Sequence, residues 1–344
     1  MAHLSRTYDG VLLVIISICC IHGSLSGEEK KDRLTAEDML FREFIVEHEK
    51  KYSPGTIEYE KRFRVFQQSL QRSEKLNIFS RKHNGTAVYG ITQFSDLTPE
   101  EFQEQYLTLK PYQPSTSANF KPAGFVKIPG DVPKKYDLRD LKAVTPVRDQ
   151  KSCGGCWAFS TVEGMATKRA LKGGPLTTLS SQQLIDCDLS DSGCSGGDTC
   201  STMKWLQVSR TGVVEERRYP FVARTGQCKM VNMTNGVRMK SHTCESYSDE
   251  SNMVSALYKN GSLVVAVDAT SWQDYLGGII QHHCSHNLNN HAVQVIGYDT
   301  AGQIPYYIVR NSWGPKWGLD GYLRVRIGGN VCGIASRVST VDVE

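Results

Sequence analysis

After its first 26 residues the sequence has no hydrophobic run long enough to cross a membrane, no long basic run, and no cysteine between residues 28 and 150. The first absence excludes a membrane span. With 40 basic and 36 acidic residues and a net charge of +4, the chain lacks the basic, aromatic-interleaved patch of nucleic-acid binders, so nucleic acid is excluded as a partner. No second CxxC or histidine pair follows at ligand spacing, which excludes a zinc site.

The N-terminus predicts a secretory signal. Arg6 precedes an apolar run from Val11 to Ile21, which is too short for a membrane helix, and small residues follow up to Ser26. We therefore predict a cleaved signal peptide over residues 1–26; the alternative is a buried core helix. Sequons at Asn84, Asn232 and Asn260 agree with this route, which leads to the lysosome or the extracellular space.

The length of 344 residues predicts two structural units. Residues 28–110 are charged and show helical periodicity, with a helix start at Thr35, a second helix after residue 56, and a third start at Thr98, where a proline and a capping-box acid follow. Two apolar stripes are expected to form the core of this unit: Leu40, Phe41, Phe44 and Ile45 on the first helix, and Phe63, Phe66 and Leu70 on the second. Between Lys110 and Pro133 the pattern dissolves into a linker.

The sequence after the linker changes from a helical to a β pattern. A helix is predicted from Cys156 to the glycines at 173 and 174, and a short one within "LSSQQLIDC". Strands are predicted at 262–269, 291–299, 306–313 and 321–329. This order favours two lobes, with a ligand cleft between them.

The cysteine count predicts one free thiol. Once Cys19 and Cys20 leave with the signal peptide, nine cysteines remain, and nine is odd. Parity does not identify the unpaired one. The stretch "RDQKSCGGCWAFST" offers a candidate in Cys156, because the positive end of the helix that begins there stabilises a thiolate. A histidine could then hold the proton as imidazolium, and the glycines at 154 and 155 let backbone donors approach a reacting carbonyl. Alone, such a cysteine is more often half of a disulfide, and a CxxC pair can also be a redox site.

The same stretch resembles the papain-like cysteine proteases, which also have a histidine and an asparagine far downstream. This sequence supplies His291 in "NNHAVQVIGYD" and Asn311 in "VRNSWGPKWG", in the expected order. The resemblance implies that Cys156 is the nucleophile, with a depressed thiol pKa, and that His291 is its acid and base. Asn311 would orient the imidazole, and Gln150 with the backbone N–H of Cys156 would form the oxyanion hole. Trp313 would shield the contact between His291 and Asn311, and Trp317 would form the wall beyond the scissile bond.

The resemblance extends over nearly the whole chain. It implies an α+β fold of two lobes, one helical and one an antiparallel β-barrel, with a helical inhibitory propeptide. The domains expected are a signal peptide (1–26), a propeptide (27–131) and a mature peptidase domain (132–344). The propeptide signatures are kept at Glu58, Arg62, Val65, Phe66, Asn77, Gly90, Phe94 and Asp96, whereas Ser69, Ser73 and Thr92 depart from them. In this family the propeptide folds on the mature domain, runs its tail backward through the cleft, and is removed at acid pH.

The resemblance also implies the disulfides. Three bridges of the family map to Cys153 with Cys194, Cys187 with Cys228, and Cys284 with Cys332. Cys200 and Cys244 are outside that set, and we predict a fourth bridge between them, which leaves Cys156 free.

The subsite residues implied are Gly196, Gly197, Asp198, Thr199, Ala292 and Arg337, around the pocket for the second residue before the cut. Arg337 has two interpretations: it accepts an acidic substrate side chain, or it pairs with Asp198 or points to solvent. The chain lacks the histidine-bearing insertion of the carboxypeptidase members, so an endopeptidase acting on proteins or peptides is expected. No metal or organic cofactor is implied, and cystatin-type inhibitors are potential partners.

Two rival functions are considered. A papain-fold binder or inhibitor without catalysis has no chemical need for Gln150, Cys156, His291 and Asn311 together. A disulfide oxidoreductase would require Cys153 and Cys156 to cycle as a pair. The histidines at 282, 283 and 286 are interpreted as part of a polar loop.

Overall fold

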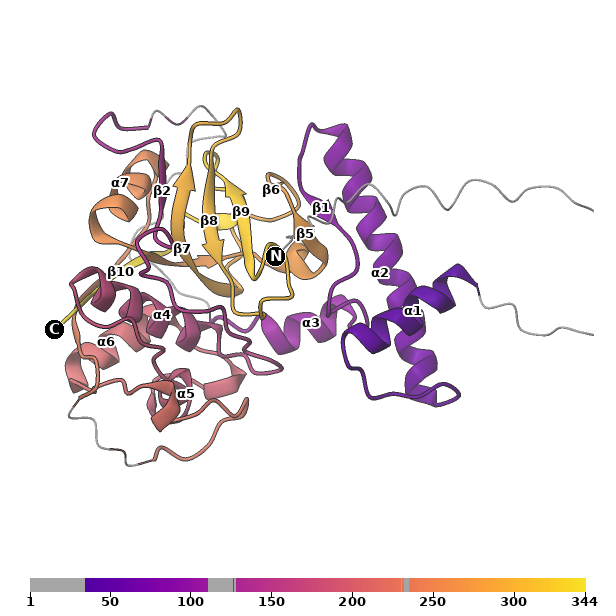
Figure 1. Ribbon diagram of the computed structural model, residues 1–344, viewed down its shortest axis with the longest axis horizontal. Coiled ribbons are helices and arrows are strands. Elements are labelled where there is room, and N and C mark those ends of the chain that lie inside the picture. Colours follow the sequence, from indigo (N-terminus) through magenta and orange to yellow (C-terminus); the bar gives the residue numbers. More distant parts are fainter. Residues whose placement is uncertain (1–34, 111–125, 127, 230, 232–234) are drawn as a thin grey trace, which may run out of the picture.

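The computed structural model describes residues 35–110, 126, 128–229, 231 and 235–344. The predicted signal peptide, most of the linker and the sequon at Asn232 lie outside these residues. The described chain forms a helical N-terminal unit, placed at one end of a larger C-terminal unit in which helices pack beside a sheet (Figure 1).

The N-terminal unit is built on two crossed helices. Its elements are α1 (Ala36–Glu47), α2 (Ile57–Lys82), β1 (Val88–Tyr89) and α3 (Pro99–Tyr106). The predicted starts are confirmed, since Thr35 and Thr98 both cap their helices through capping boxes. The core of the unit is aromatic, and its fully or nearly buried members are Phe41, Phe44, Tyr59 and Phe66. Leu40 was placed on the same apolar stripe as Phe41 and Phe44 from the sequence, but it is 37% exposed.

The C-terminal unit begins with a helical lobe. Its helices are α4 (Cys156–Leu171), α5 (Ser181–Cys187) and α6 (Thr199–Ser209), with short 3₁₀ turns η2 (Gly193–Ser195) and η3 (Glu216–Arg218). The first twelve residues of α4, from Cys156 to Thr167, are all buried, because other elements surround this part of the helix. The apolar core around Trp157, Met165 and Leu184 also takes in one side of the sheet, through residues such as Val264 and Val341.

The second lobe is a predominantly antiparallel eight-stranded sheet. Along its path the strands follow the order β3 (Met239–Glu245), β10 (Val338–Val343), β4 (Leu263–Val267), β7 (His291–Asp299), β8 (Tyr306–Arg310), β9 (Tyr322–Arg326) and β6 (Ile279–Ile280), and β2 (Lys135–Asp137) also pairs with β7. The other elements are α7 (Glu250–Asn260), η4 (Thr270–Asp274), β5 (Tyr275–Gly277) and η5 (Val331–Gly333). Its core is separate from that of the helical lobe. The strands predicted from the sequence correspond to β4, β7, β8 and β9, which confirms the two-lobe expectation.

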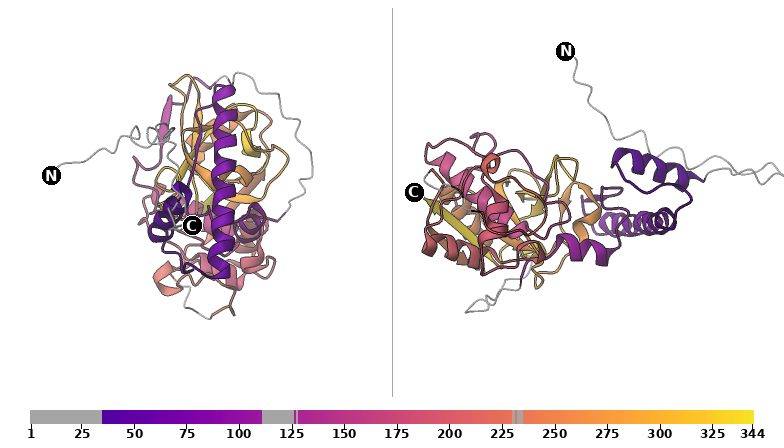
Figure 2. Two further views of the ribbon diagram at one scale, coloured as in Figure 1. Left: turned by 90° about the vertical axis from the view of Figure 1, so that its right-hand side faces the viewer. Right: turned by 90° about the horizontal axis from the view of Figure 1, so that it is seen from below.

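The N-terminal unit docks against the sheet lobe through α2, β1 and α3. Figure 2 shows α2 as a long rod lying across that end of the molecule. β1 pairs antiparallel with β5, so the two units share a small sheet. Apolar residues of the N-terminal unit, including Phe94, Phe102 and Leu107, join the core of the sheet lobe. Among the described residues, no helix has both the length and the apolar character needed to cross a membrane.

Four disulfides are present, all in the C-terminal unit. They join Cys153 to Cys194, Cys187 to Cys228, Cys200 to Cys244, and Cys284 to Cys332. These are the four pairs expected, including the fourth bridge. Among the described cysteines only Cys156 is free.

Candidate active site

Cys156 opens helix α4, and its thiol is fully buried. The loop before it is held by the bridge from Cys153 to Cys194 and by the hydrogen bond from Gly154 N–H to the Cys194 carbonyl (2.9 Å). A Cβ on Gly154 would lie 2.0 Å from Thr108 Oγ1 and 2.6 Å from the Cys194 carbonyl, so only glycine fits there. The backbone N–H groups of Ala292, Trp157 and Cys156 itself point at the sulfur, which is the arrangement that stabilises a thiolate.

His291 is the first residue of β7, on the opposite lobe, and Ala292 follows it on the same strand. The His291 Nε2 lies 2.8 Å from Asn311 Oδ1. The backbone N–H of Ser312 also donates to that oxygen (2.8 Å), which fixes the orientation of the Asn311 amide. Nε2 is therefore the donor, and in the neutral imidazole Nδ1 is left as an acceptor.

Tryptophans surround the histidine. Trp313 stacks on the His291 ring, with ring centroids 4.8 Å apart and an interplanar angle of 28°. Trp317 packs edge-on against Trp313 and donates its indole N–H to the Trp272 carbonyl (3.2 Å). All three indoles are buried. They separate the contact between His291 and Asn311 from water, which strengthens it.

Gln150 is held by Ser312, a residue that the sequence analysis did not single out. The Ser312 hydroxyl donates to Gln150 Oε1 (2.6 Å), and Gln150 N–H donates to the Ser312 carbonyl (2.8 Å). Gln150 Nε2 donates to the Cys153 carbonyl (3.0 Å) and faces the Tyr106 carbonyl at 3.5 Å. Ser312 directly follows Asn311 in the sequence, and this position is the signal that could have identified it.

Residues 106–110 form a strap through the site, where the resemblance implied that the propeptide tail would run, although these residues were not named from the sequence. Its N–H groups bond to both sides: Leu109 to the Asn290 carbonyl (3.0 Å) and Lys110 to the Gly197 carbonyl (2.8 Å). The Thr108 hydroxyl donates to the Gly154 carbonyl (3.0 Å). The Tyr106 carbonyl lies near both Gln150 Nε2 and the His291 imidazole. This strap covers the thiol and the imidazole.

Burial under the strap makes both groups neutral. It raises the pKa of the Cys156 thiol to about 11, and it lowers the pKa of His291 to about 4 despite the hydrogen bond that His291 donates to Asn311. The resemblance implied a depressed thiol pKa for the catalytic cysteine, whereas burial in the covered site shifts the pKa of Cys156 upward. Desolvation outweighs the three N–H groups aimed at the sulfur. Within the described part of the chain, His291 Nδ1 makes no hydrogen bond.

The residues predicted to line subsites lie on both lobes: Gly196, Gly197, Asp198 and Thr199 on the helical lobe, and Ala292 and Arg337 on the sheet lobe. A Cβ on Gly196 would meet the Thr108 carbonyl at 2.1 Å, and one on Gly197 would meet the Trp157 ring at 2.6 Å. Asp198 caps α6, of which Thr199 is the first residue, and Ala292 is buried beside His291. Arg337, 3% exposed, pairs with Asp198 (Nη1 to Oδ2, 2.7 Å). The structure thus has the pairing named as one of the two interpretations of Arg337. Trp317 lies behind Trp313.

The N-terminal unit is fastened to the sheet lobe by polar contacts. Arg72 binds both carboxylate oxygens of Asp274 (2.6 and 2.8 Å). The residues that depart from the family signatures contribute here: Ser69 donates to Asp274 Oδ1 (3.1 Å) and Thr92 to the Gln273 carbonyl (2.6 Å). Ser73 instead lies within 3.5 Å of the Gly90 carbonyl of its own unit. No group of three or more His, Cys, Asp or Glu residues placed to hold a metal occurs among the described residues.

Comparisons with known proteins agree with this geometry. Residues 132–341 match the papain family cysteine protease model, and residues 41–102 match the cathepsin propeptide inhibitor domain. Human cathepsin O is 47% identical over 282 residues, which cover 81% of this chain and 87% of that protein. Cysteine proteinase 1 of Dictyostelium discoideum is 32% identical, with 96% of this chain and 98% of that protein covered.

Solved structures of precursors show the same fold. Digestive procathepsin L2 from Tenebrio molitor larval midgut superposes with a TM-score of 0.77 at 30% identity, over 89% of this chain and 99% of that one. The recombinant stem bromelain precursor gives a TM-score of 0.75 at 32% identity, over 90% and 99%. Two family models together span most of the chain, and relatives match it over nearly their full length. The chain belongs to the papain family of cysteine proteases, with a cathepsin-type propeptide domain ahead of the peptidase domain.

Proposed function

We propose that this zymogen cysteine peptidase works through Cys156 as nucleophile, His291 as acid and base, and Asn311 as the residue that orients the imidazole. One observation carries the proposal. An unpaired thiol at a helix N-terminus lies against the N–H of Ala292, next to a histidine whose Nε2 is tied to Asn311 and whose Nδ1 is left to accept a proton.

The residues divide the chemistry as follows. His291 takes the proton of Cys156, and the thiolate adds to the carbonyl carbon of the scissile peptide bond. The resulting oxyanion is stabilised by Gln150 Nε2 and the Cys156 N–H. His291 returns its proton to the leaving amine as the C–N bond breaks, which leaves a thioester. Water, deprotonated by His291, then attacks the thioester, and the acid product leaves as the thiol is restored.

The strap explains why the precursor is inactive. Its Tyr106 carbonyl stands where the proposed oxyanion donor points, and its tail leads away along Gly197. In the substrate placement that we propose, residues before the cut lie along Gly197, so the strap runs in the opposite direction and offers no correctly oriented bond. When the strap leaves, water reaches the site and desolvation falls. The thiolate and imidazolium forms then become accessible.

The same proposal covers processing and location. We place the signal peptide at residues 1–26, the propeptide at 27–131 and the mature peptidase at 132–344, and we expect the mature enzyme in the lysosome or outside the cell. Asn84 and Asn260 are exposed and can carry glycans. Cystatin-type inhibitors are the expected protein partners, because the cleft that the strap fills is a groove for an extended chain.

We further propose that Gly196, Gly197, Asp198, Thr199, Ala292 and Arg337 line the pockets for residues before the cut. Trp313 shields the contact between His291 and Asn311, and Trp317 forms the wall beyond the cut. The strap supports this placement, since Leu109 packs in the core of the helical lobe and the Lys110 carbonyl lies 3.3 Å from Arg337 Nη1. Because Arg337 is held by Asp198, an acidic side chain in this pocket would have to compete with that carboxylate.

The decisive experiment is to acidify the purified proprotein and add an epoxide probe that reacts with thiols, in parallel with a peptide substrate. Label confined to Cys156, appearing together with turnover, is the expected result. A Cys156→Ser proprotein is the matched control, which should fold, take no label and stay unprocessed. A folded wild-type protein that shows neither label nor turnover after the strap is removed would instead support the rival papain-fold binder.

A further inference from the structure

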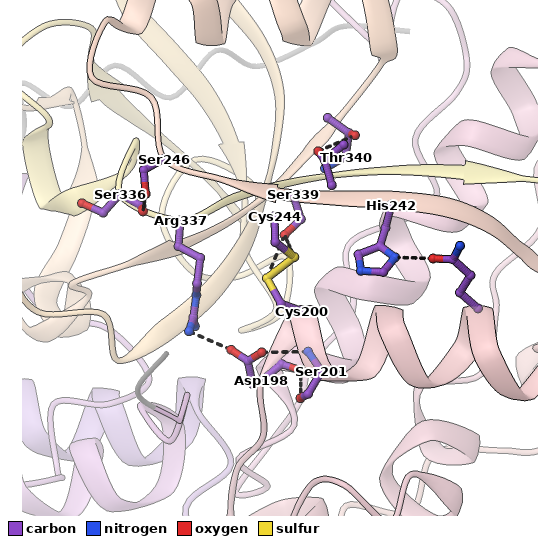
Figure 3. The surroundings of a disulfide bond; sticks show 12 residues. Asp198, Cys200, Ser201, His242, Cys244, Ser246, Ser336, Arg337, Ser339 and Thr340 are labelled. Atoms are coloured by element: carbon purple, nitrogen blue, oxygen red, sulfur yellow. Dashed lines mark hydrogen bonds and ion pairs between the residues drawn. A yellow bond between two sulfur atoms is a disulfide. The ribbon is translucent and has the colours of Figure 1, made fainter. Parts of the chain in front are cut away.

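The fourth disulfide has no part in the chemistry proposed above. Cys200 lies in the first turn of α6 and Cys244 near the end of β3, so the bridge ties the N-terminus of a helix in one lobe to a strand of the large sheet. Figure 3 shows the bridge next to the ion pair of Asp198 and Arg337. The two links therefore span the same gap.

The sequence positions of the two links correspond on both sides of that gap. Asp198 caps α6 two residues before Cys200, and its Oδ1 accepts a hydrogen bond from Ser201 N–H (2.8 Å). On the sheet, Cys244 is the register partner of Ser339, which follows Arg337 by two residues. The Ser339 hydroxyl lies 3.5 Å from the Cys200 sulfur and 3.4 Å from the Cys244 sulfur. A covalent link and an ionic link are thus anchored two residues apart.

Arg337 faces the cleft as well as the helix. Its Nη1 contacts both Asp198 Oδ2 and the strap carbonyl of Lys110, and the Lys110 N–H bonds to Gly197. The guanidinium is therefore placed at the border of the groove that a substrate would occupy. Asp198 therefore competes with an acidic substrate side chain for this charge.

Such an ion pair needs an imposed geometry. Both side chains are nearly buried, so both have lost hydration, and their attraction compensates only while the carboxylate and guanidinium stay in contact. A helix N-terminus that could shift away from the sheet would open the pair. A disulfide across the same gap limits that shift and keeps the carboxylate in place.

We propose that the Cys200–Cys244 bridge is a positioning element for substrate selection: it holds Asp198 on Arg337, so that the pocket for the second residue before the cut is neutralised and prefers apolar side chains. This inference rests on the proposed function, because it assigns a regulator to one of its pockets. Without the bridge the pair opens, and Arg337 accepts an acidic side chain. The two sequence-based interpretations of Arg337, pairing with Asp198 and accepting an acidic side chain, then describe the pocket with and without the bridge.

The test compares two peptides that differ only in having leucine or glutamate at that position, with each enzyme processed beforehand. In the Cys200→Ser/Cys244→Ser variant, the ratio of kcat/KM for the glutamate over the leucine peptide is expected to rise about tenfold, mainly through KM. Asp198→Asn should raise the ratio similarly, since asparagine keeps the helix cap but removes the charge. Adding Arg337→Gln to either variant should abolish the gain.

A cycle separates positioning from plain stabilisation. If the bridge acts through the ion pair, combining the serine changes with Asp198→Asn raises the ratio no further than Asp198→Asn alone. A lower Tm with an unchanged ratio, or a fully additive rise, would overturn the inference. Should the serine variant not fold, Cys200→Ala/Cys244→Val fills the same space with apolar groups. Wild-type enzyme inactive on both peptides would count against the proposed function instead.

Discussion

The propeptide domain and the peptidase domain are each stabilised internally by different interactions. The first has no disulfide among its described residues, a small aromatic core, and several ion pairs, such as that of Arg62 with Glu101 (2.6 Å). The second has four disulfides and two large apolar cores. Acid protonates carboxylates and imidazoles but leaves disulfides and apolar contacts intact. One condition can therefore release the inhibitor and spare the enzyme.

The interface between the two domains contains the same acid-sensitive kinds of contact as the propeptide domain. Apart from apolar packing it depends on the ion pair of Arg72 and Asp274, on strap hydrogen bonds, and on histidine rings of the loop after β6. The strap also keeps the Cys156 thiol and the His291 imidazole neutral by desolvation. The inhibitor thus covers the two groups that we propose for catalysis and keeps them uncharged.

The largest effect is expected from a change that removes the activity of the peptidase domain and leaves the propeptide domain intact. His291→Ala removes the group that moves the proton, so we expect kcat/KM to fall by roughly 10⁴-fold or more, with no autoprocessing after acidification. The measurement is peptide turnover by variant that has been processed with an added protease. The exposed His286, changed to alanine, is the control and should retain full activity. Retained turnover by His291→Ala would refute the role of this histidine.

A smaller loss is expected at the proposed oxyanion hole. Gln150→Ala removes one donor and should lower kcat by roughly a hundredfold, or about 3 kcal/mol, with KM little changed. Ser312→Ala leaves Gln150 present but unheld, so its loss should be smaller and again confined to kcat. Steady-state kinetics of both variants provide the measurement. If Ser312→Ala cost more than Gln150→Ala, the hydroxyl would have a role other than positioning the glutamine.

Much of the secondary structure of the two domains could be predicted from local sequence. The capping boxes at Thr35 and Thr98 and the four apolar strands each follow from short-range rules, and the structure confirms them. The strand β3 was not predicted, because "MKSHTCE" is polar and mostly exposed at the edge of the sheet. Its pairing with β10 depends on contacts about a hundred residues away.

The residues of the site could be predicted from the sequence, but their protonation states could not. Gln150, Cys156, His291 and Asn311 were named from the resemblance, and the structure brings them together. Their protonation could not be read from them, because it is set by the strap of residues 106–110, which in the sequence is only the short stretch that leads into the linker. Long-range desolvation leaves no local signature.

A substitution in the interface should weaken the attachment of the propeptide domain to the peptidase domain. Arg72→Gln leaves Asp274, which is 1% exposed, without its countercharge. Because Arg72 is itself 25% exposed, the loss is less than for a fully buried pair, and we expect propeptide release at mildly acidic pH to become about tenfold faster. The matched control is Arg81→Gln on the same helix, whose pair with Glu74 is exposed on both sides. Equal rates for the two variants would show that the Asp274 pair does not hold the domain.

The smallest effect is expected at a group of histidines between the domains. His282 and His283, which were expected in a polar loop, pack instead on Phe79 of α2, at centroid distances of 5.8 and 4.6 Å. His83 stacks on the same ring at 3.9 Å, and Tyr89 contacts His283. The charged or titratable groups that face His283 are thus two further imidazoles and a phenol. The loop is anchored by the bridge of Cys284 to Cys332.

The sign of the pH effect follows from the pKa of His283. Burial lowers this pKa in the docked state, and the neighbouring His282 and His83 lower it further, although the Leu76 carbonyl opposes them. The undocked state then binds more protons, so docking is stronger at higher pH. Its stability is lost as the pH falls through the ordinary histidine value near 6.5 toward the lower docked value. Acid therefore favours release.

His283→Gln removes this titration while keeping a polar side chain of similar length. The pH midpoint of propeptide release should shift downward by less than one unit, because carboxylates and the other two imidazoles still titrate. His286→Gln, in the same loop but exposed, should leave the midpoint unchanged. Release is followed by gel after timed acidification of proprotein in the Cys156→Ser background, cut in the linker by an added protease. A midpoint that moves upward would reverse the sign argued here, since it would mean that protonation of this ring favours docking.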